Sequence, residues 1–281
     1  MRPTPPPTVG FQVVRTFPHA RDAFTQGLYF EPGGTLLEST GLYGESSVRR
    51  VDLSSGRVIT SHRLPARWFG EGITVTKDGR CIQLLWKDGI GLVRDVDTFA
   101  VVRTFKLPTA EGWGLTTAGD DLLLSDGTSR LRVLDSESFR VKRTITVRSG
   151  GAAVRNLNEL QMVRGLVWAN IWRDDRIAAI DPATGDVRFW VDMAPLLKFP
   201  ERRRDGYEEV LNGIGYDAAR DRLFVTGKCW ETTYQIAVGS DDGAGPSAGH
   251  GATRGAWARG RWPAWAGDWA PDGLPWPRLG G

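Results

Sequence analysis

The segment Phe69-Gly70-Glu71-Gly72-Ile73 decides the fold, because its last three residues belong to a pattern that recurs along the chain. Each copy has a polar or aromatic residue, then in most copies a glycine, then Leu or Ile. The copies, at intervals of 42 to 54 residues, are Gln26-Gly27-Leu28, Glu71-Gly72-Ile73, Trp113-Gly114-Leu115, Asn158-Glu159-Leu160 and Asn212-Gly213-Ile214. A repeat of this length is typical of a β-propeller blade.

Each repeat carries the signals of four short strands. The first copy continues as Leu28-Tyr29-Phe30 and breaks at the turn Pro32-Gly33-Gly34 before a second strand begins. A third strand ends in an Asp-led turn, as at residues 51–56 and 180–185, and a fourth follows, as at residues 100–105. The sequence therefore predicts an all-β fold, a five-bladed β-propeller with four-stranded blades.

The missing fourth strand of the last repeat is found at the other end of the chain. Val13-Val14-Arg15-Thr16-Phe17 repeats, letter for letter, the fourth strand of the second repeat, Val101-Val102-Arg103-Thr104-Phe105. We expect this N-terminal strand to close the last blade and to cover its open edge. The predicted organisation is an N-terminal extension over residues 1–10, the propeller over 11–239, and a Gly/Pro/Trp-rich tail over 240–281 that is expected to be disordered.

Composition narrows the classes of partner. The formal charge of the 281 residues is +3, and the basic residues are scattered among acids, so we expect no nucleic-acid partner. The chain has no run of 18 apolar residues, so we expect no membrane span.

Cys81 and Cys229 have no C-x-x-C spacing, and a disulfide between them stays open. The N-terminus lacks the apolar run of a secretory signal, which predicts a cytoplasmic protein, and we expect a monomer.

Chemically unlike residues occupy equivalent positions in the repeats. In an antiparallel blade the first strand runs one way and the second runs back. The start of the first strand and the end of the second therefore lie on the same face of the propeller. The strand starts supply Gln26, Glu71, Trp113, Asn158 and Asn212, and the strand ends supply Thr40, Trp86, Asp126, Trp172 and Lys228. Five blades that solve the same packing problem favour like residues, so amides, acids, indoles and an amine on one face indicate a binding or catalytic site.

Eight segments also carry a family resemblance. They are Phe24-Thr25-Gln26-Gly27-Leu28, Glu38-Ser39-Thr40-Gly41-Leu42-Tyr43-Gly44, Phe69-Gly70-Glu71-Gly72-Ile73, Glu111-Gly112-Trp113-Gly114-Leu115, Leu157-Asn158-Glu159-Leu160, Ala169-Asn170-Ile171-Trp172, Leu211-Asn212-Gly213-Ile214 and Thr226-Gly227-Lys228. In this order they resemble the motifs of plant and bacterial glutamine cyclotransferases over residues 11 to about 238. The tail has no counterpart, and Gln161 stands where the family more often has an acid.

The resemblance implies an enzyme that cyclises the N-terminal glutamine of peptides or proteins to pyroglutamate with release of ammonia. It also suggests a secreted or periplasmic protein if the chain begins further upstream. The family's pocket residues carry over to Phe24, Gln26, Phe69, Glu71, Trp86, Trp113, Asn158, Trp172 and Lys228.

The chemistry of this reaction assigns roles to these residues. The nucleophile is the substrate's own α-amine, so the site needs proton transfer and charge stabilisation rather than an activated Ser or Cys. Glu71 is expected to act as general base and then as general acid. Lys228 is expected to stabilise the oxyanion, with help from the amide of Gln26 or Asn158. The aromatic residues would enclose the glutamine methylenes and attract the ammonium group; they are Phe24, Phe69, Trp86, Trp113 and Trp172.

Neither a metal nor another cofactor is expected to take part. His19, His62 and His250 lack metal-ligand spacing, which predicts independence of zinc, although a structural calcium ion in the central channel stays open. Two alternatives remain at this point. One is a calcium-dependent, lactonase-like hydrolase that uses Glu71 and Asn158 together with Asn212, and the other is a non-catalytic propeller that binds peptides.

Overall fold

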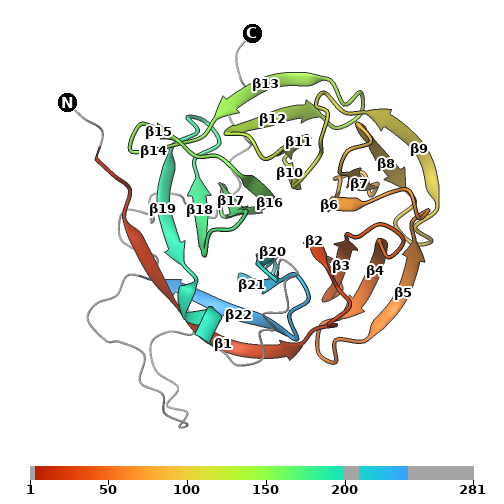
Figure 1. Ribbon diagram of the computed structural model, residues 1–281, viewed down its shortest axis with the longest axis horizontal. Coiled ribbons are helices and arrows are strands. Elements are labelled where there is room, and N and C mark those ends of the chain that lie inside the picture. Colours follow the sequence, from red (N-terminus) through yellow and green to blue (C-terminus); the bar gives the residue numbers. More distant parts are fainter. Residues whose placement is uncertain (1–3, 199–208, 240–281) are drawn as a thin grey trace.

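The computed structural model describes residues 4–198 and 209–239. Over these residues the chain is built of β-sheets around a central axis, and its helical content is the short 3-10 helix η1 (Ala194–Lys198) (Figure 1). Three antiparallel sheets have four strands each: β2 (Thr25–Phe30), β3 (Thr35–Thr40), β4 (Ser47–Asp52) and β5 (Val58–Arg63); β6 (Gly70–Val75), β7 (Cys81–Leu85), β8 (Ile90–Arg94) and β9 (Val101–Lys106); and β10 (Leu115–Ala118), β11 (Asp121–Leu124), β12 (Arg130–Asp135) and β13 (Val141–Thr146).

The remaining long strands form one eight-stranded sheet. It runs in the order β16-β17-β18-β19-β1-β22-β21-β20. A two-stranded hairpin, β14 (Arg148–Ser149) with β15 (Ala152–Ala153), lies between β13 and β16 in the chain. The strands are β16 (Leu157–Val163), β17 (Leu166–Ile171), β18 (Arg176–Ile180), β19 (Val187–Asp192), β20 (Leu211–Asp217), β21 (Arg222–Gly227), β22 (Thr232–Gly239) and β1 (Thr8–Pro18).

The innermost strands surround the axis. β2 contacts β6, β6 contacts β10, β10 contacts β16, β16 contacts β20, and β20 returns to β2 (Figure 1). From each of these inner strands the chain moves outward through successive antiparallel strands, and β1, the first strand of the chain, lies between β19 and β22. The predicted all-β class is confirmed, and the four-stranded sheets fit the blades of a propeller.

The N-terminal strand joins distant parts of the chain. β1 pairs antiparallel with β22, from Gly10 opposite Gly239 to Pro18 opposite Thr232, so the predicted pairing with the last strand is confirmed. β1 also pairs in parallel with β19, through Thr8 and Val9, which the sequence did not predict. At its other end, Phe17 packs edge-on against Phe224, at 5.9 Å between ring centroids. The strand therefore stabilises the sheets on both of its sides.

His19 continues this closure just beyond β1. Its Nδ1 lies 2.6 Å from the carbonyl oxygen of Trp230 and its Nε2 lies 2.9 Å from Oε1 of Glu38, in β3. Two acceptors around one ring require both nitrogens to carry protons, which is the charged form. Burial alone lowers the pKa of His19, but the Glu38 carboxylate raises that pKa above its ordinary value. Burial likewise opposes the ionisation of Glu38, but its charged partners bring its pKa below the ordinary value.

Asp-led turns connect third and fourth strands as the sequence predicted. Oδ1 of Asp52 accepts a bond of 2.8 Å from the backbone N–H of Ser55, and Oδ1 of Asp181 accepts one of 2.8 Å from that of Ala183. Such side-chain bonds satisfy backbone N–H groups in the turn, which have no partner on a neighbouring strand.

The inner strands approach so closely that most repeats need glycine at the second position of the pattern. A Cβ atom at Gly114 would lie 2.0 Å from the carbonyl oxygen of Asn158, so no other residue fits there. The fourth repeat instead has Glu159, whose side chain crosses from β16 to accept bonds from the N–H groups of Leu28 (3.3 Å) and Ile214 (3.0 Å). Burial raises the pKa of Glu159 well above its usual range, against the effect of these two bonds. Glu159 thus links three inner strands.

Three further expectations concern the disulfide, the membrane span and the tail. Cys81 and Cys229 are both free thiols, so the disulfide left open by the sequence does not form. No helix within residues 4–198 and 209–239 is long and apolar enough to cross a bilayer. The predicted tail, residues 240–281, lies outside the described residues.

Candidate active site

Aromatic rings from the first two sheets pack together beside the inner strands. Phe24 precedes β2, Phe69 precedes β6 and Trp86 follows β7. The ring centroids of Phe24 and Phe69 are 6.2 Å apart, and those of Phe69 and Trp86 are 5.2 Å apart. Gly41 makes room for this packing, because a Cβ atom there would lie 2.3 Å from the Phe69 ring. Both Phe rings are buried and Trp86 is half-buried, so the cluster has one solvent-facing side.

Two further indoles extend this cluster. Trp113, before β10, and Trp172, after β17, meet edge-on with ring centroids 5.7 Å apart, and both are half-buried. Glu111 connects them to the first group, because its Oε2 accepts a bond of 3.0 Å from Nε1 of Trp86 and another of 3.0 Å from Nε1 of Trp113. One carboxylate oxygen of Glu111 therefore holds an indole of the second sheet, Trp86, and the indole that precedes the third sheet, Trp113.

Lys228 contacts the aromatic cluster at Phe24. It follows β21 and is buried, with 4% of its surface exposed. Its Nζ lies 4.6 Å from the ring centroid of Phe24, within the range of a cation–π contact. The structure thus brings together, in one continuous run of contacts, residues that the sequence places far apart: Lys228, Phe24, Phe69, Trp86, Glu111, Trp113 and Trp172.

Glu71 lies inside this arrangement at the start of β6. Its side chain is buried, and its Oε1 accepts a bond of 3.2 Å from Nε2 of Gln26. Gln26 in turn accepts a bond of 3.1 Å from Nδ2 of Asn212, so its amide is oriented with nitrogen toward the acid. Burial is the main cause that raises the pKa of Glu71 well above its usual range. The nearby Lys228 ammonium opposes this shift, and the Glu111 carboxylate adds to it.

The electrostatics of Glu71 suit proton transfer. A carboxyl group with a raised pKa is a stronger base once ionised and gives its proton up closer to neutral pH than an ordinary glutamate does. Its surroundings hold one cation and one anion, Lys228 and Glu111, so the proton affinity of the site depends on both.

Asn158 occupies the equivalent position at the start of β16. It is 3% exposed, and its backbone carbonyl accepts a bond of 2.6 Å from the hydroxyl of Ser125. Ser125 also accepts a bond of 2.7 Å from the N–H of Gly114, next to Trp113. These bonds fix the starts of two inner strands relative to each other.

Two other ring positions named by the sequence have structural partners. Asp126 accepts bonds of 2.6 Å from Arg132 and 2.6 Å from the hydroxyl of Thr128. The hydroxyl of Thr40 bonds that of Ser47 at 2.8 Å. Both side chains stabilise the ends of their own sheets, and we assign them no chemistry.

Sequence reasoning gave no site role to Glu111 or Tyr43, and it gave Asn212 one only in the calcium-dependent alternative, yet the structure places all three in contact with predicted site residues. Glu111 bonds two predicted indoles, Asn212 orients Gln26, and the exposed ring of Tyr43 lies 5.4 Å from Phe69. Each lies in one of the eight segments that carry the family resemblance, and that position is the signal that could have marked it.

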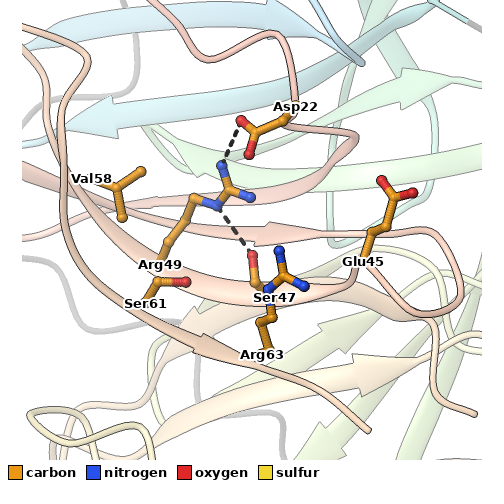
Figure 2. Close-up of a pocket in the computed structure, with 7 residues that line it drawn as sticks. All are labelled: Asp22, Glu45, Ser47, Arg49, Val58, Ser61 and Arg63. Carbon is orange, nitrogen blue, oxygen red and sulfur yellow. Dashed lines mark hydrogen bonds and ion pairs between the residues drawn. The ribbon is translucent and has the colours of Figure 1, made fainter. Parts of the chain in front are cut away.

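A polar cavity of about 500 Å³ lies apart from the aromatic rings, on the first sheet (Figure 2). Arg49 crosses it and donates to Asp22 at 3.2 Å and to the hydroxyl of Ser47 at 3.1 Å. Glu45 and Arg63 add one charge of each sign to the lining. The cavity contains two acids and two arginines, and we assign it no part in catalysis.

Comparison with known proteins identifies relatives over nearly all of the described chain. The glutamine cyclotransferase family matches residues 2–238. A glutaminyl-peptide cyclotransferase from Arabidopsis thaliana is 43% identical over 227 residues, which cover 81% of this chain and 71% of that protein. The crystal structure of Myxococcus xanthus glutaminyl cyclase is similar with a TM-score of 0.77 at 32% identity, covering 83% of this chain and 98% of that one.

Proposed function

The chain belongs to the glutamine cyclotransferase family, and we propose that it converts the N-terminal glutamine of peptides and proteins to pyroglutamate, as a glutaminyl-peptide cyclotransferase. The observation that carries this proposal is the buried carboxyl group of Glu71, which is held by Gln26 and is subject to the opposing charges of Lys228 and Glu111. The family match does not favour the hydrolase or the non-catalytic alternative.

Substrate binding rests on the half-buried indoles. The glutamine side chain of the substrate is apolar except at its amide, so its methylenes would pack against Trp86, Trp113 and Trp172. Its α-ammonium group is attracted to the faces of the same rings. Phe69 packs against Trp86, and Phe24 packs against Phe69 in turn.

The reaction forms one bond and breaks one. The α-nitrogen of the substrate attacks the carbon of its own side-chain amide, which closes the five-membered ring, and the bond from that carbon to the amide nitrogen then breaks. In this proposal ionised Glu71 takes the proton that the α-nitrogen loses and returns a proton to the leaving nitrogen, which departs as ammonia. The substrate supplies its own nucleophile, so orientation replaces a covalent enzyme intermediate.

The attack places negative charge on the amide oxygen. We propose that the Lys228 ammonium group stabilises this oxyanion, with the amide of Gln26 or Asn158 as a further donor. The burial of Lys228 strengthens such an interaction, because screening by water is reduced.

We also propose a five-bladed propeller. The eight-stranded sheet divides at the parallel contact between β1 and β19 into two four-stranded units, which join the other three sheets around the axis. Glu159, whose two carboxylate oxygens accept backbone N–H groups, is assigned a structural role at this axis. No metal is required in the proposed steps, since a carboxylate moves the proton and an ammonium group holds the charge.

The test is to incubate the purified protein with a dipeptide that begins with glutamine and to measure ammonia and pyroglutamyl product. The same peptide with an acetylated α-amine is the control, because it lacks the nucleophile and should release no ammonia. Binding without ammonia release would support the non-catalytic alternative instead. Ammonia accompanied by a glutamyl rather than a pyroglutamyl product would indicate hydrolysis and contradict cyclisation.

A further inference from the structure

The carboxylate of Glu111 accepts both indole N–H groups of the half-buried pair Trp86 and Trp113, each at 3.0 Å. We propose that Glu111 is a positioning residue, which fixes these two indoles around the substrate and whose negative charge acts on the carboxyl group of Glu71. This inference rests on the proposed function and names a residue that the reaction as described above does not use.

The hydrogen-bond geometry carries the positioning role. An indole has one donor, and bonding it to a charged acceptor selects one ring orientation among those that packing allows. Trp86 follows β7 and Trp113 precedes β10, so a single oxygen atom fixes the rings relative to each other. The backbone supports this arrangement, because the N–H of Gly112, between Glu111 and Trp113, donates to the carbonyl of Trp86 at 3.0 Å.

The charge of Glu111 carries the second role. The charged groups that act on Glu71 are Lys228, which favours its ionised form, and Glu111, which opposes it. Removal of the Glu111 charge should therefore lower the pKa of Glu71, whereas removal of the Lys228 charge should raise it. The backbone brings the two acids into the same region, because the N–H of Gly72, next to Glu71, donates to the carbonyl of Trp113, two residues after Glu111, at 2.7 Å.

Two substitutions separate these roles. Glu111→Gln keeps an oxygen that can accept the indole N–H groups but removes the charge, whereas Glu111→Leu removes both. Glu45→Gln is the matched control, because Glu45 is an exposed acid that is not among the residues in contact from Lys228 to Trp172. The measurements are KM, kcat and the pH dependence of kcat/KM for ammonia release from a Gln-initiated dipeptide, together with thermal unfolding to show that each variant is folded.

We expect Glu111→Leu to raise KM about tenfold, which is the typical effect of losing bonds to a charged acceptor. Glu111→Gln should raise KM less than about threefold. It should nevertheless move the acidic limb of the kcat/KM profile to lower pH, and Glu45→Gln should change neither quantity. Since Glu111→Gln preserves side-chain shape, it keeps the inference testable even if Glu111→Leu does not fold.

The results also distinguish the two proposals. If the wild-type protein releases no ammonia, the proposed function itself fails. If the wild type is active and folded Glu111→Leu keeps KM within about twofold, the positioning role is overturned. An acidic limb that stays in place in active Glu111→Gln would overturn the role of the charge.

Discussion

Replacement of Glu71 by Gln removes the only group that the proposed reaction uses to move a proton. The substitution is nearly isosteric, and the new side-chain oxygen can accept the same bond that Nε2 of Gln26 donates to Glu71 at 3.2 Å. A change in rate then reports proton transfer rather than altered packing. The effect should be large, because Glu71 is only 4% exposed and bulk water has little access to act in its place.

General acid–base catalysis by one side chain is worth about 10²- to 10⁴-fold in rate. The burial of Glu71 places the expected loss of kcat in the upper half of that range, about 10³- to 10⁴-fold, or roughly 4–5.5 kcal/mol in the activation free energy. Binding should change less, because the indoles are untouched and Glu111 keeps its charge. Loss of one negative charge near the substrate ammonium is expected to weaken binding by about 1 kcal/mol.

The pH dependence follows from the raised pKa of Glu71. The ionised form is the base, so wild-type kcat/KM should fall as pH falls through that raised value, and the Glu71→Gln profile should lack this limb. Stability should move in the opposite direction to activity. Burial disfavours ionised Glu71 in the folded state above the pKa of the unfolded chain, so the variant should unfold at the same temperature as the wild type or higher.

The assay is ammonia release at saturating Gln-dipeptide, with Glu45→Gln as the control that also loses one acid. A folded Glu71→Gln protein that keeps more than about a tenth of wild-type kcat would refute the assignment. Glu111, whose charge acts on Glu71, would then be the next carboxylate to test.

Trp113→Ala should raise KM more than it lowers kcat, because it removes contacts made already in the ground state; steady-state kinetics check this, and a loss confined to kcat would be inconsistent with a binding role. Deletion of residues 1–17 removes the pairing of β1 with β22 and the buried side chains of Val9 and Phe17, each worth about 1.5–3 kcal/mol, so Tm should fall by roughly 10–20 °C in thermal unfolding. An unchanged Tm would show that the closing strand is dispensable. Prolonged treatment with a zinc chelator should leave the rate of ammonia release unchanged, and a loss of activity that added zinc restores would contradict the metal-free mechanism. The ion pair of His19 with Glu38 should stabilise the fold fully between about pH 4.5 and 6.5, the ordinary pKa values of the two groups. The excess Tm of the wild type over His19→Gln should therefore be largest there and shrink as pH rises through the raised pKa of His19. A Tm difference that does not change with pH would mean that the pair is not ionised.

The repeated local patterns determined the strands and their order. Alternating apolar residues, Asp-led turns and the spacing of the inner-strand pattern act within a few residues of each other, so the sequence could predict four-stranded units. The identity between residues 13–17 and 101–105 likewise predicted that the N-terminal strand pairs with the last sheet. Equivalent positions in the repeats predicted that Glu71, Trp113 and Lys228 share one face of the propeller.

Only the tertiary structure decided how these side chains pair. Glu111 precedes Trp113 by two residues but lies 25 residues from Trp86, and its bond to both indoles depends on how two neighbouring sheets are set side by side. The parallel contact of β1 with β19 depends in the same way on where the ring closes. The raised pKa of Glu71 follows from burial and from charges on other sheets, so it is a property of distances in space, which a pattern of residue types does not contain.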